Sequence, residues 1–340
     1  MPSTESNILF THSGGVTSVV NTVASTLADL SKNASRKLYI SRFGILGILD
    51  GDFIDAHAIP QSEWELIAQT PGSSFGSSRT SLPENIDDFK PIFEYLDQHN
   101  IHTFICNGGN NSQVLTLKMH QAAQALGYPL QCIGVPKTID NDIFHTDTCP
   151  GYGSCAKYTA TSVLEMSLDL ASMCNSATQV LIYEAMGRDT GWIAAASALA
   201  KNHPAQGPHI ILVPEANFTI EMIMDRIKAC IKTYNHCVIC LAEGINDQNN
   251  TLGSERPNYT YISLYLNKLI QKELKLKTHV VIPDYLQRSA RHTASLTDIL
   301  QTKALAQHAF SLASTDVNGI MVTIKPVSYT HLTLPTILLV

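Results

Sequence analysis

Short apolar runs alternate with longer amphipathic stretches along most of this chain. The apolar runs lie at 8–10, 38–40, 103–106, 131–135, 180–183, 210–213, 238–242 and 280–282, and the amphipathic stretches lie at 17–30, 113–126, 156–173, 190–200, 221–233 and 264–275. Runs of these lengths and periods predict buried strands and amphipathic helices. Their alternation predicts right-handed βαβ crossovers and mostly parallel sheets.

The length of 340 residues exceeds the usual size of a single core, so we expect two α/β lobes with a substrate cleft between them. A hydrophobic fraction of 44% and a charged fraction of 15% are typical of a soluble globular enzyme. The net charge of -6, without a lysine or arginine run, argues against a nucleic-acid binder. We find no internal repeat or membrane-spanning run, and the polar insert 247–258 is predicted to be an exposed loop.

Eight cysteines are scattered along the chain, and the polar start 1–7 has no secretory apolar region. We therefore expect reduced thiols and a cytoplasmic protein. Cys237 and Cys240 have the spacing of a redox or zinc pair, but they lie in an apolar run without a second pair. Because they would face opposite sides of a strand, core packing is favoured over metal or redox use.

The heptapeptide 136–142, Pro-Lys-Thr-Ile-Asp-Asn-Asp, directly follows the apolar run 131–135. Pro136 should end the strand, so the polar residues project at the carboxyl end of a parallel sheet, where ligands bind. One of the two aspartates, Asp140 and Asp142, could accept the proton of a sugar hydroxyl, while the other could orient a metal or the first acid. Lys137 offers a positive charge to phosphoryl oxygens. The alternative is a turn whose Asp and Asn side chains satisfy local backbone donors.

Two glycine-rich loops each follow a predicted strand and precede a predicted helix. The first glycine loop, 11–17, contains Gly14 and Gly15, and the second, 107–112, contains Gly109. Backbone N–H groups and positive helix ends at such loops can bind an anion. Two loops at one sheet edge could converge on a pyrophosphate or triphosphate. Ordinary tight turns, or helix capping by Asn110 or Ser112, remain alternatives.

Three further polar segments follow predicted strands. Their sequences are Met-Gly-Arg at 186–188, Ala-Glu-Gly at 242–244 and Tyr-Leu-Gln-Arg at 285–288. An arginine at such a strand end can clamp a phosphate, and Glu243 can accept hydrogen bonds from sugar hydroxyls. Singly, each could instead be a surface charge or an ion pair.

Together, in this order, these segments resemble the signatures of the phosphofructokinase family over residues 7–326. The resemblance implies two Rossmann-like three-layer α/β/α lobes with mostly parallel sheets and an active-site cleft between them. It places the phosphoryl-donor lobe at 1–140 plus about 290–316. The fructose 6-phosphate lobe is placed at about 141–289 plus about 317–326. The remaining residues, 327–340, resemble translated sequencing-adapter sequence and are expected to be a non-native tail, with a genuine terminal strand as the alternative.

The resemblance also implies roles for individual residues. Asp140 would deprotonate the 1-hydroxyl of fructose 6-phosphate, with Lys137 and Asp142 as further catalytic residues and Mg²⁺ as the metal. The substrate-binding positions would be Thr138, Ile139, Met186, Gly187, Arg188, Glu243, Tyr285, Leu286, Gln287 and Arg288. The diphosphate-binding positions would be Gly14, Gly15, Arg79, Gly109, Asn111 and Ser112. Asn110 occupies the metal-binding position, and a homodimer or homotetramer is expected.

Two positions bear on the phosphoryl donor, because ATP-dependent family members typically carry glycine where this chain has Lys137 and Asn111. Side chains there would crowd a nucleotide, so the chain resembles the diphosphate-dependent branch, which works reversibly near equilibrium. Asn110 departs from the magnesium-binding aspartate of most members, and an amide is a weaker ligand for a hard cation. Asn111 departs from the aspartate usual in diphosphate enzymes. An ATP-dependent kinase, a catalytically weak regulatory subunit and a sugar-phosphate sensing module remain the alternatives.

Overall fold

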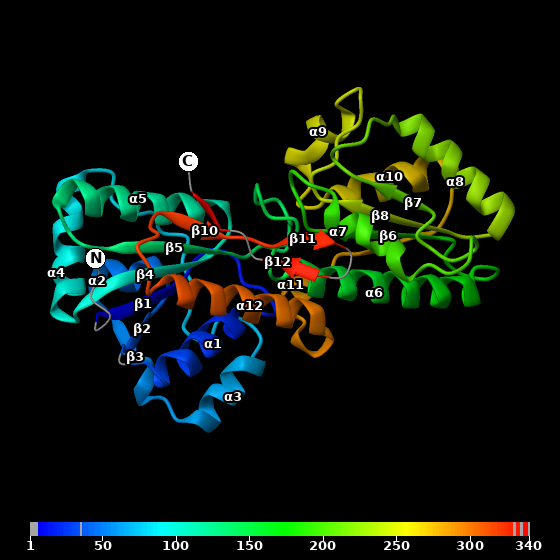
Figure 1. Ribbon diagram of the computed structural model, residues 1–340. Coiled ribbons are helices and arrows are strands. Elements are labelled where there is room, and N and C mark those ends of the chain that lie inside the picture. The colour runs from blue at the N-terminus through cyan, green and yellow to red at the C-terminus, as the bar shows by residue number, and fades with distance from the viewer. Residues whose placement is uncertain (1–5, 35, 329–330, 334–335, 339–340) are drawn as a thin grey trace. The chain divides into compact units, whose positions relative to one another are not determined.

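The protein consists of two compact α/β units (Figure 1). The computed structural model describes residues 6–34, 36–328, 331–333 and 336–338. Unit 1 comprises Met1–Ser154 and Ser289–Val340, and unit 2 comprises Cys155–Arg288. None of the helices in these described ranges is long and apolar enough to cross a membrane.

Unit 1 is built on a seven-stranded sheet in the order β13-β10-β5-β4-β1-β2-β3. The strands are β1 (Asn7–His12), β2 (Leu38–Ser41), β3 (Phe53–Asp55), β4 (Ile101–Gly108), β5 (Gln131–Pro136), β10 (Ile320–Val322) and β13 (Thr336–Leu338). The inner strands pair in parallel, whereas β3 and β13 pair antiparallel at the two edges. A separate antiparallel pair is formed by β11 (Lys325–Ser328) and β12 (His331–Thr333).

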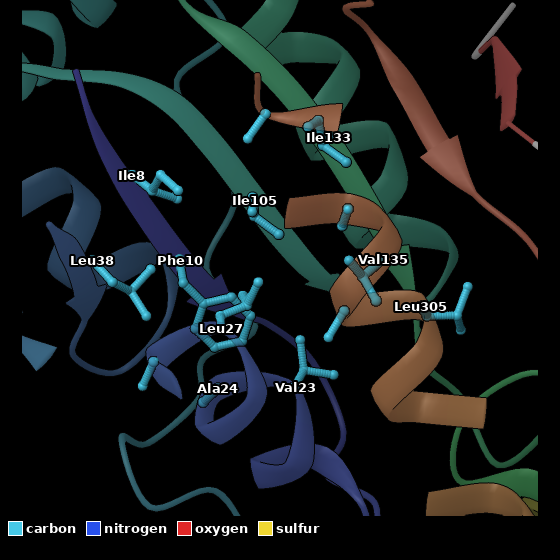
Figure 2. Packing of buried hydrophobic residues seen from close by; sticks show 14 of the residues in the cluster. Ile8, Phe10, Val23, Ala24, Leu27, Leu38, Ile105, Ile133, Val135 and Leu305 are labelled. Atoms are coloured by element: carbon cyan, nitrogen blue, oxygen red, sulfur yellow. The ribbon is translucent and has the colours of Figure 1, made fainter. Parts of the chain in front are cut away.

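Helices cover both faces of this sheet. They are α1 (Val20–Lys32), α2 (Ile45–Asp50), α3 (Gln61–Gln69), α4 (Lys90–Gln98), α5 (Asn110–Leu126) and α12 (Leu296–Leu312), with 3-10 turns at Ala56–Ala58, Ile86–Phe89 and Arg291–Thr293. Ile8 and Phe10 of β1 belong to the core cluster that contains Leu27 of α1 and Leu305 of α12 (Figure 2). Leu9, between them in sequence, belongs to the second cluster. Side chains alternate across a strand, so β1 buries both of its faces, and its middle residues 8–10 are all apolar.

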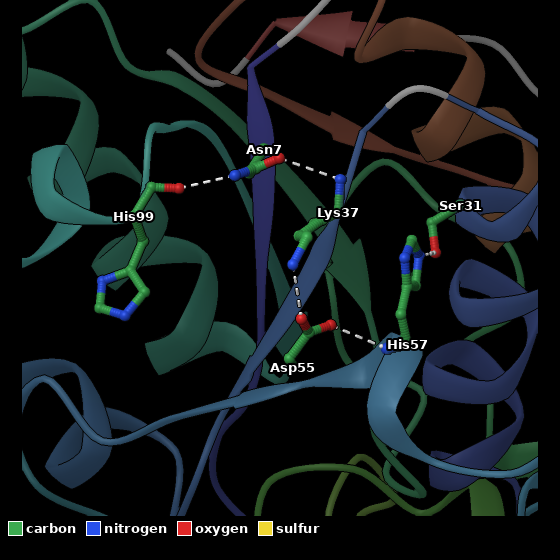
Figure 3. Close-up of polar contacts among 6 residues, drawn as sticks. All are labelled: Asn7, Ser31, Lys37, Asp55, His57 and His99. Carbon is green, nitrogen blue, oxygen red and sulfur yellow. Dashed lines mark hydrogen bonds and ion pairs between the residues drawn. The ribbon is translucent and has the colours of Figure 1, made fainter.

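Polar contacts fix the amino end of this sheet (Figure 3). The Asn7 amide donates to the His99 carbonyl at 2.7 Å and accepts from the Lys37 backbone at 3.0 Å, which joins β1 to its neighbours. Lys37 also pairs with Asp55 of the antiparallel edge strand at 3.0 Å. This ion pair is half-exposed, so it contributes little stability and mainly fixes the position of β3.

Unit 2 contains a four-stranded parallel sheet in the order β7-β8-β6-β9. Its strands are β6 (Val180–Ala185), β7 (Ile210–Leu212), β8 (Cys237–Ala242) and β9 (Thr278–Val281). Its helices are α6 (Tyr152–Met173), α7 (Trp192–Ala196), α8 (Ile220–Tyr234), α9 (Thr251–Glu255), α10 (Ile262–Leu274) and α11 (Tyr285–Ser289), with 3-10 turns at Ser197–Ala200 and Arg256–Asn258. Helix α6 begins and α11 ends in unit 1.

The α/β class with mostly parallel sheets agrees with the prediction, but several boundaries differ. Residues 317–326 were predicted in the second lobe, yet β10 pairs in parallel with β5, and 141–154 also belong to unit 1. Helix α1 begins at Val20 and not at position 17. The prediction that 247–258 is an exposed loop was wrong, because α9 forms there and buries Leu252. The predicted non-native tail, 327–340, lies partly outside the described residues.

Candidate functional site

The heptapeptide 136–142 starts at the carboxyl end of β5, which ends at Pro136 as predicted. The Lys137 backbone N–H donates to the Gly108 carbonyl at 2.9 Å, beside the end of β4. The side chain of Lys137 turns inward, because the residue is only 3% exposed. Its ammonium group donates to the carbonyl of Ser13 at 3.3 Å and to that of Gly15. Lys137 therefore joins the heptapeptide to the first glycine loop.

The two glycine loops lie together, as predicted, because β1 and β4 are neighbours in the sheet. The Ser112 hydroxyl donates to the Ser13 carbonyl at 3.4 Å, which links the second loop to the first. The segment that ends at Arg79 supports them. The Gly14 N–H donates to the Ser78 carbonyl at 3.1 Å, and the Ser77 hydroxyl donates to the Gly14 carbonyl at 2.6 Å.

Glycine is required in these loops at two positions. Gly14 has φ +81°, a conformation that L side chains rarely adopt. A Cβ at Gly108 would lie 2.0 Å from the Ser112 hydroxyl oxygen. The loops can therefore bring their backbones close to one another, and to a small anion, only with glycine at these positions.

One of the two helices that follow the glycine loops begins later than predicted. Helix α1 begins only at Val20, so its positive end does not lie directly at Gly14. Helix α5 begins at Asn110 with Gly109 as N-cap, and no side chain caps it. The capping alternative for Asn110 and Ser112 is therefore wrong. The Ser112 N–H already donates to the Gly109 carbonyl at 2.9 Å, so the N–H groups of Asn110 and Asn111 are the ones that the start of α5 can offer to an anion.

A cavity of about 390 Å³ opens beside these loops. Its lining residues are Ser13, Gly14, Ser78, Arg79, Thr80, Ser81, Leu82, Asn111, Ser112, Val114, Leu115 and Lys118. Four predicted diphosphate positions line it, whereas Gly15 and Gly109 do not. Arg79 and Lys118 give it positive charge, and Lys118 was not predicted from the sequence.

The carboxylates of the heptapeptide have different surroundings. Asp140 is half-buried, and its backbone N–H donates to the Thr138 hydroxyl at 3.1 Å. Asp142 is exposed and accepts a hydrogen bond from the Asn110 side-chain amide at 2.8 Å. The local turn is made by Asn141, which has φ +53° and accepts from the Cys149 N–H at 2.8 Å. The Asn141 side chain thus stabilises the turn.

Two buried polar residues that the sequence analysis missed support the same region. His12 ends β1, and burial, together with the Lys137 charge, holds its pKa well below the usual range. Its imidazole is therefore neutral at pH 7. Asp298 of α12 accepts from the N–H groups of Gly151 and Ser154 at 3.0 Å each, and so fixes the start of α6. Burial raises the pKa of Asp298.

In unit 2, the three predicted sugar-phosphate segments follow the ends of β6, β8 and β9, which are adjacent in the sheet. The Glu243 N–H donates to the Ala185 carbonyl at 2.9 Å, which aligns the two strand ends. The Arg188 guanidinium lies 3.7 Å from the Glu243 carboxylate. Arg188 is largely exposed, so this contact leaves its remaining donors accessible to a ligand.

Close backbone approach also marks this second site. Gly187 has φ +119°, and a Cβ there would lie 2.4 Å from the Thr190 carbonyl oxygen. A Cβ at Gly244 would lie 1.6 Å from the Arg188 carbonyl oxygen. These glycines let the turns after β6 and β8 pack against each other, which places Arg188 beside Glu243.

The four residues 285–288 form most of the short helix α11, and they do not all face the same way. Tyr285 and Leu286 are each 63% exposed, and the Arg288 guanidinium lies 4.0 Å from the centre of the Tyr285 ring. Gln287 is only 2% exposed and accepts from the Met186 N–H at 3.4 Å. Gln287 therefore helps to hold the backbone that follows β6. Ile139 of the heptapeptide is also buried, at 7% exposure.

Comparison with known proteins identifies the family. The family model described as Phosphofructokinase matches residues 7–313. The pyrophosphate--fructose 6-phosphate 1-phosphotransferase of Xanthomonas campestris pv. campestris (strain B100) is 41% identical over 337 residues, covering 96% of this chain and 81% of the relative.

Two solved structures are similar over nearly the whole chain. The pyrophosphate-dependent phosphofructokinase of Marinobacter aquaeolei superposes with a TM-score of 0.87 at 37% identity, covering 98% of this chain and 82% of that one. The pyrophosphate-dependent phosphofructokinase of Nitrosospira multiformis superposes with a TM-score of 0.89 at 35% identity, covering 99% of this chain and 83% of that one. The chain therefore belongs to the phosphofructokinase family.

Proposed function

We propose that this protein transfers a phosphoryl group from diphosphate to the 1-hydroxyl of fructose 6-phosphate, giving fructose 1,6-bisphosphate and phosphate, and that it does so reversibly. The observation that carries this proposal is the buried side chain of Lys137, whose ammonium group reaches from the heptapeptide to the carbonyls of the first glycine loop. The relatives named pyrophosphate--fructose 6-phosphate 1-phosphotransferase, at 35–41% identity, support the same donor.

The donor would bind at the two glycine loops of unit 1. The backbone N–H groups at the start of α5, at positions 110 and 111, and the side chains of Arg79, Asn111 and Ser112 would bind its oxygens. The Asn111 side chain lines the cavity, and Lys137 lies beneath the loop, 3.9 Å from the position of a Cβ at Gly14. A compact diphosphate suits this arrangement because it presents charge to every donor group and needs no room for a nucleoside.

Asp140 would act as the base. As the sugar oxygen attacks phosphorus, the hydroxyl proton passes to the Asp140 carboxylate, the bond to the leaving phosphate breaks, and Lys137 stabilises the charge on the transferred group. Its half-buried position keeps Asp140 accessible to a substrate. Thr138, bonded to the Asp140 backbone, would hold the turn in this geometry.

The residues present fit Mg²⁺ as a partner of the diphosphate. Asp142 offers carboxylate oxygens, one of which accepts from the Asn110 amide nitrogen at 2.8 Å, and oxygen is the ligand that Mg²⁺ prefers. Bound Mg²⁺ would neutralise charge on the phosphoryl oxygens. Because Mg²⁺ keeps several waters and binds through one or two carboxylates plus substrate phosphates, Asp142 would compensate for the weaker amide of Asn110.

In unit 2, Arg188 and Arg288 would bind the phosphate of fructose 6-phosphate, and Glu243 would accept from its hydroxyls. Gly187 and Gln287 would fix the backbone that carries them. Met186, Tyr285 and Leu286 complete this site in the proposal. We further propose a cytoplasmic homo-oligomer, and the eight free thiols are consistent with a reducing compartment.

The test is a donor assay on the purified protein and its Asp140→Asn variant. We expect turnover of fructose 6-phosphate with diphosphate, little or none with ATP, and a loss of at least about 10³-fold in kcat for the variant. Turnover with ATP alone would overturn the donor assignment. Fructose 6-phosphate binding without turnover by the parent would favour the regulatory or sensing alternative.

A further inference from the structure

A buried glutamine, Gln113, lies between the second glycine loop and the strand that leads into the heptapeptide. It belongs to the first turn of α5, directly after the positions proposed to bind diphosphate, and it is 6% exposed. Its side-chain nitrogen donates to the Gly108 carbonyl at 2.9 Å and to the Val135 carbonyl at 3.2 Å. Gly108 is the last residue of β4, and Val135 precedes the last residue of β5. One side chain therefore ties α5 to the carboxyl ends of two neighbouring strands.

The Gly108 carbonyl is the point at which α5 and the heptapeptide meet. It accepts from the Gln113 side chain and also from the Lys137 backbone N–H, each at 2.9 Å. A carbonyl oxygen has two lone pairs, so these two bonds use both of them. The first residue after β5 and the first turn of α5 are thus held on one shared acceptor, and the Gln113 side chain sets the distance between them.

Packing leaves the Gln113 side chain a single orientation. Both groups that its nitrogen faces are carbonyl acceptors, so a flipped amide would set oxygen against oxygen. A Cβ at Gly134 would lie 2.0 Å from the Gln113 side-chain oxygen, so glycine at this position of β5 makes room for the amide. Among the described residues, that oxygen has no hydrogen-bond partner. A buried acceptor without a partner is unfavourable, which offsets part of the stability that the two donated bonds contribute.

We infer that Gln113 is a positioning residue for phosphoryl transfer, because its bonds to the Gly108 and Val135 carbonyls fix the start of α5 relative to the heptapeptide. The inference rests on the proposed function, in which the start of α5 binds diphosphate and the heptapeptide carries Asp140 and Lys137. The sugar oxygen must meet the phosphorus atom in line, and a displacement of about 1 Å can cost about 10²-fold in rate. Gln113 is buried, so it acts through these two segments and not by contact with a substrate.

The same strand offers a matched control at its other end. Gln131 is the first residue of β5 and is also buried. Its side-chain nitrogen donates to three backbone carbonyls of the segment 312–317, at 2.6–3.0 Å. It lies about 17 Å from Pro136, at 3.3 Å per residue. Removing the Gln131 amide therefore breaks bonds of the same kind, far from the heptapeptide and both glycine loops.

The experiment compares Gln113→Met and Gln131→Met with the parent at saturating diphosphate and fructose 6-phosphate, at a temperature where circular dichroism shows each protein to be folded. Both variants should lower Tm, because each loses buried hydrogen bonds. Only Gln113→Met should lower kcat, by about 10–100-fold, with KM for fructose 6-phosphate within about threefold of the parent. Equal kcat values for the two variants, or a higher KM for diphosphate without a lower kcat in Gln113→Met, would overturn the inference.

Gly134→Ala tests the same contact from β5. The new methyl group would displace the Gln113 amide, so kcat should fall about tenfold or more in the parent background. In a Gln113→Ala background the same change should lower kcat by no more than about twofold, because the displaced group is already absent. Additive losses in the double variant would contradict the role of Gln113.

Hydrogen exchange gives a readout that does not depend on turnover. In Gln113→Met the Lys137 backbone N–H should exchange at least about fivefold faster, because the carbonyl that accepts it is no longer held, and Gln131→Met should leave its exchange unchanged. Unchanged exchange in Gln113→Met, with a parent that turns over diphosphate, would overturn the positioning role alone. A parent that does not turn over diphosphate would instead overturn the proposed function, and with it the role of Gln113 in transfer.

Discussion

Lys137→Met removes the ammonium group that joins the heptapeptide to the first glycine loop while keeping most of the side-chain volume. The residue is 3% exposed, and its charge lies against the carbonyls of Ser13 and Gly15. A preorganised donor that stabilises developing charge contributes about 2.7–4 kcal/mol, which is 10²–10³-fold in kcat. We therefore expect a loss of 10²–10³-fold in kcat/KM for diphosphate, with little change in the affinity for fructose 6-phosphate.

Lys118→Met is the matched control for this change. Lys118 lines the same cavity, but it is more exposed and pairs with Glu84 at 2.9 Å on the surface. Exposed ion pairs contribute about 0–1 kcal/mol, so this variant should lose no more than about fivefold.

The assay measures fructose 1,6-bisphosphate formation with diphosphate varied at saturating fructose 6-phosphate, and circular dichroism checks that each variant is folded. The reasoning is refuted if folded Lys137→Met stays within about threefold of the parent. Equal losses in Lys137→Met and Lys118→Met would also contradict it, because a general charge effect would then explain both.

Three further predictions concern other parts of the chain. Gly244→Ala should lower Tm and raise KM for fructose 6-phosphate at least tenfold, because the new methyl group would lie 1.6 Å from the Arg188 carbonyl oxygen; an unchanged thermal melt would contradict this. Asn111→Gly widens the donor cavity, so the ratio of ATP to diphosphate kcat/KM should rise about tenfold or more in steady-state assays. His209 has a pKa lowered to about 4, chiefly by burial, so the unfolded state binds more protons between about pH 6.5 and 4. Stability should therefore fall by about 1–2 kcal/mol, after discounting for partial exposure, as pH falls through that window. In the parent, the His209 ring accepts a hydrogen bond from the Val238 N–H, and protonation of the ring breaks this bond. Urea unfolding of His209→Gln should therefore show a smaller loss of stability over the same pH range.

The sequence predicted the parallel strands and the segments that follow them, because each strand carries its own local signal. Residues 132–135 are apolar and Pro136 ends the strand, so the position of the heptapeptide could be predicted directly. Helix α12 and strand β10 were not predicted. Their contacts are with α1 and β5, far away in the sequence, and residue patterns do not record such distant partners.

Within the candidate site, the sequence predicted the chemistry of each residue type, but it did not predict the direction in which each side chain points. Asp140 and Lys137 lie in the predicted segment, yet only packing decides that Lys137 turns inward to the Ser13 carbonyl. Gln287 follows a predicted strand in the same way, yet only the tertiary structure shows that it is buried and accepts from the Met186 N–H. A side chain on a short helix can face either way, and the sequence alone does not specify which.

By itself, the sequence determined which groups stand at the carboxyl ends of the strands, since apolar runs, prolines and glycines act locally on the backbone. The tertiary structure decided which of those groups meet. Neighbouring strands brought Ser112 to Ser13 and Asn110 to Asp142. Such contacts depend on strand order and side-chain direction, which are set by how the whole core packs.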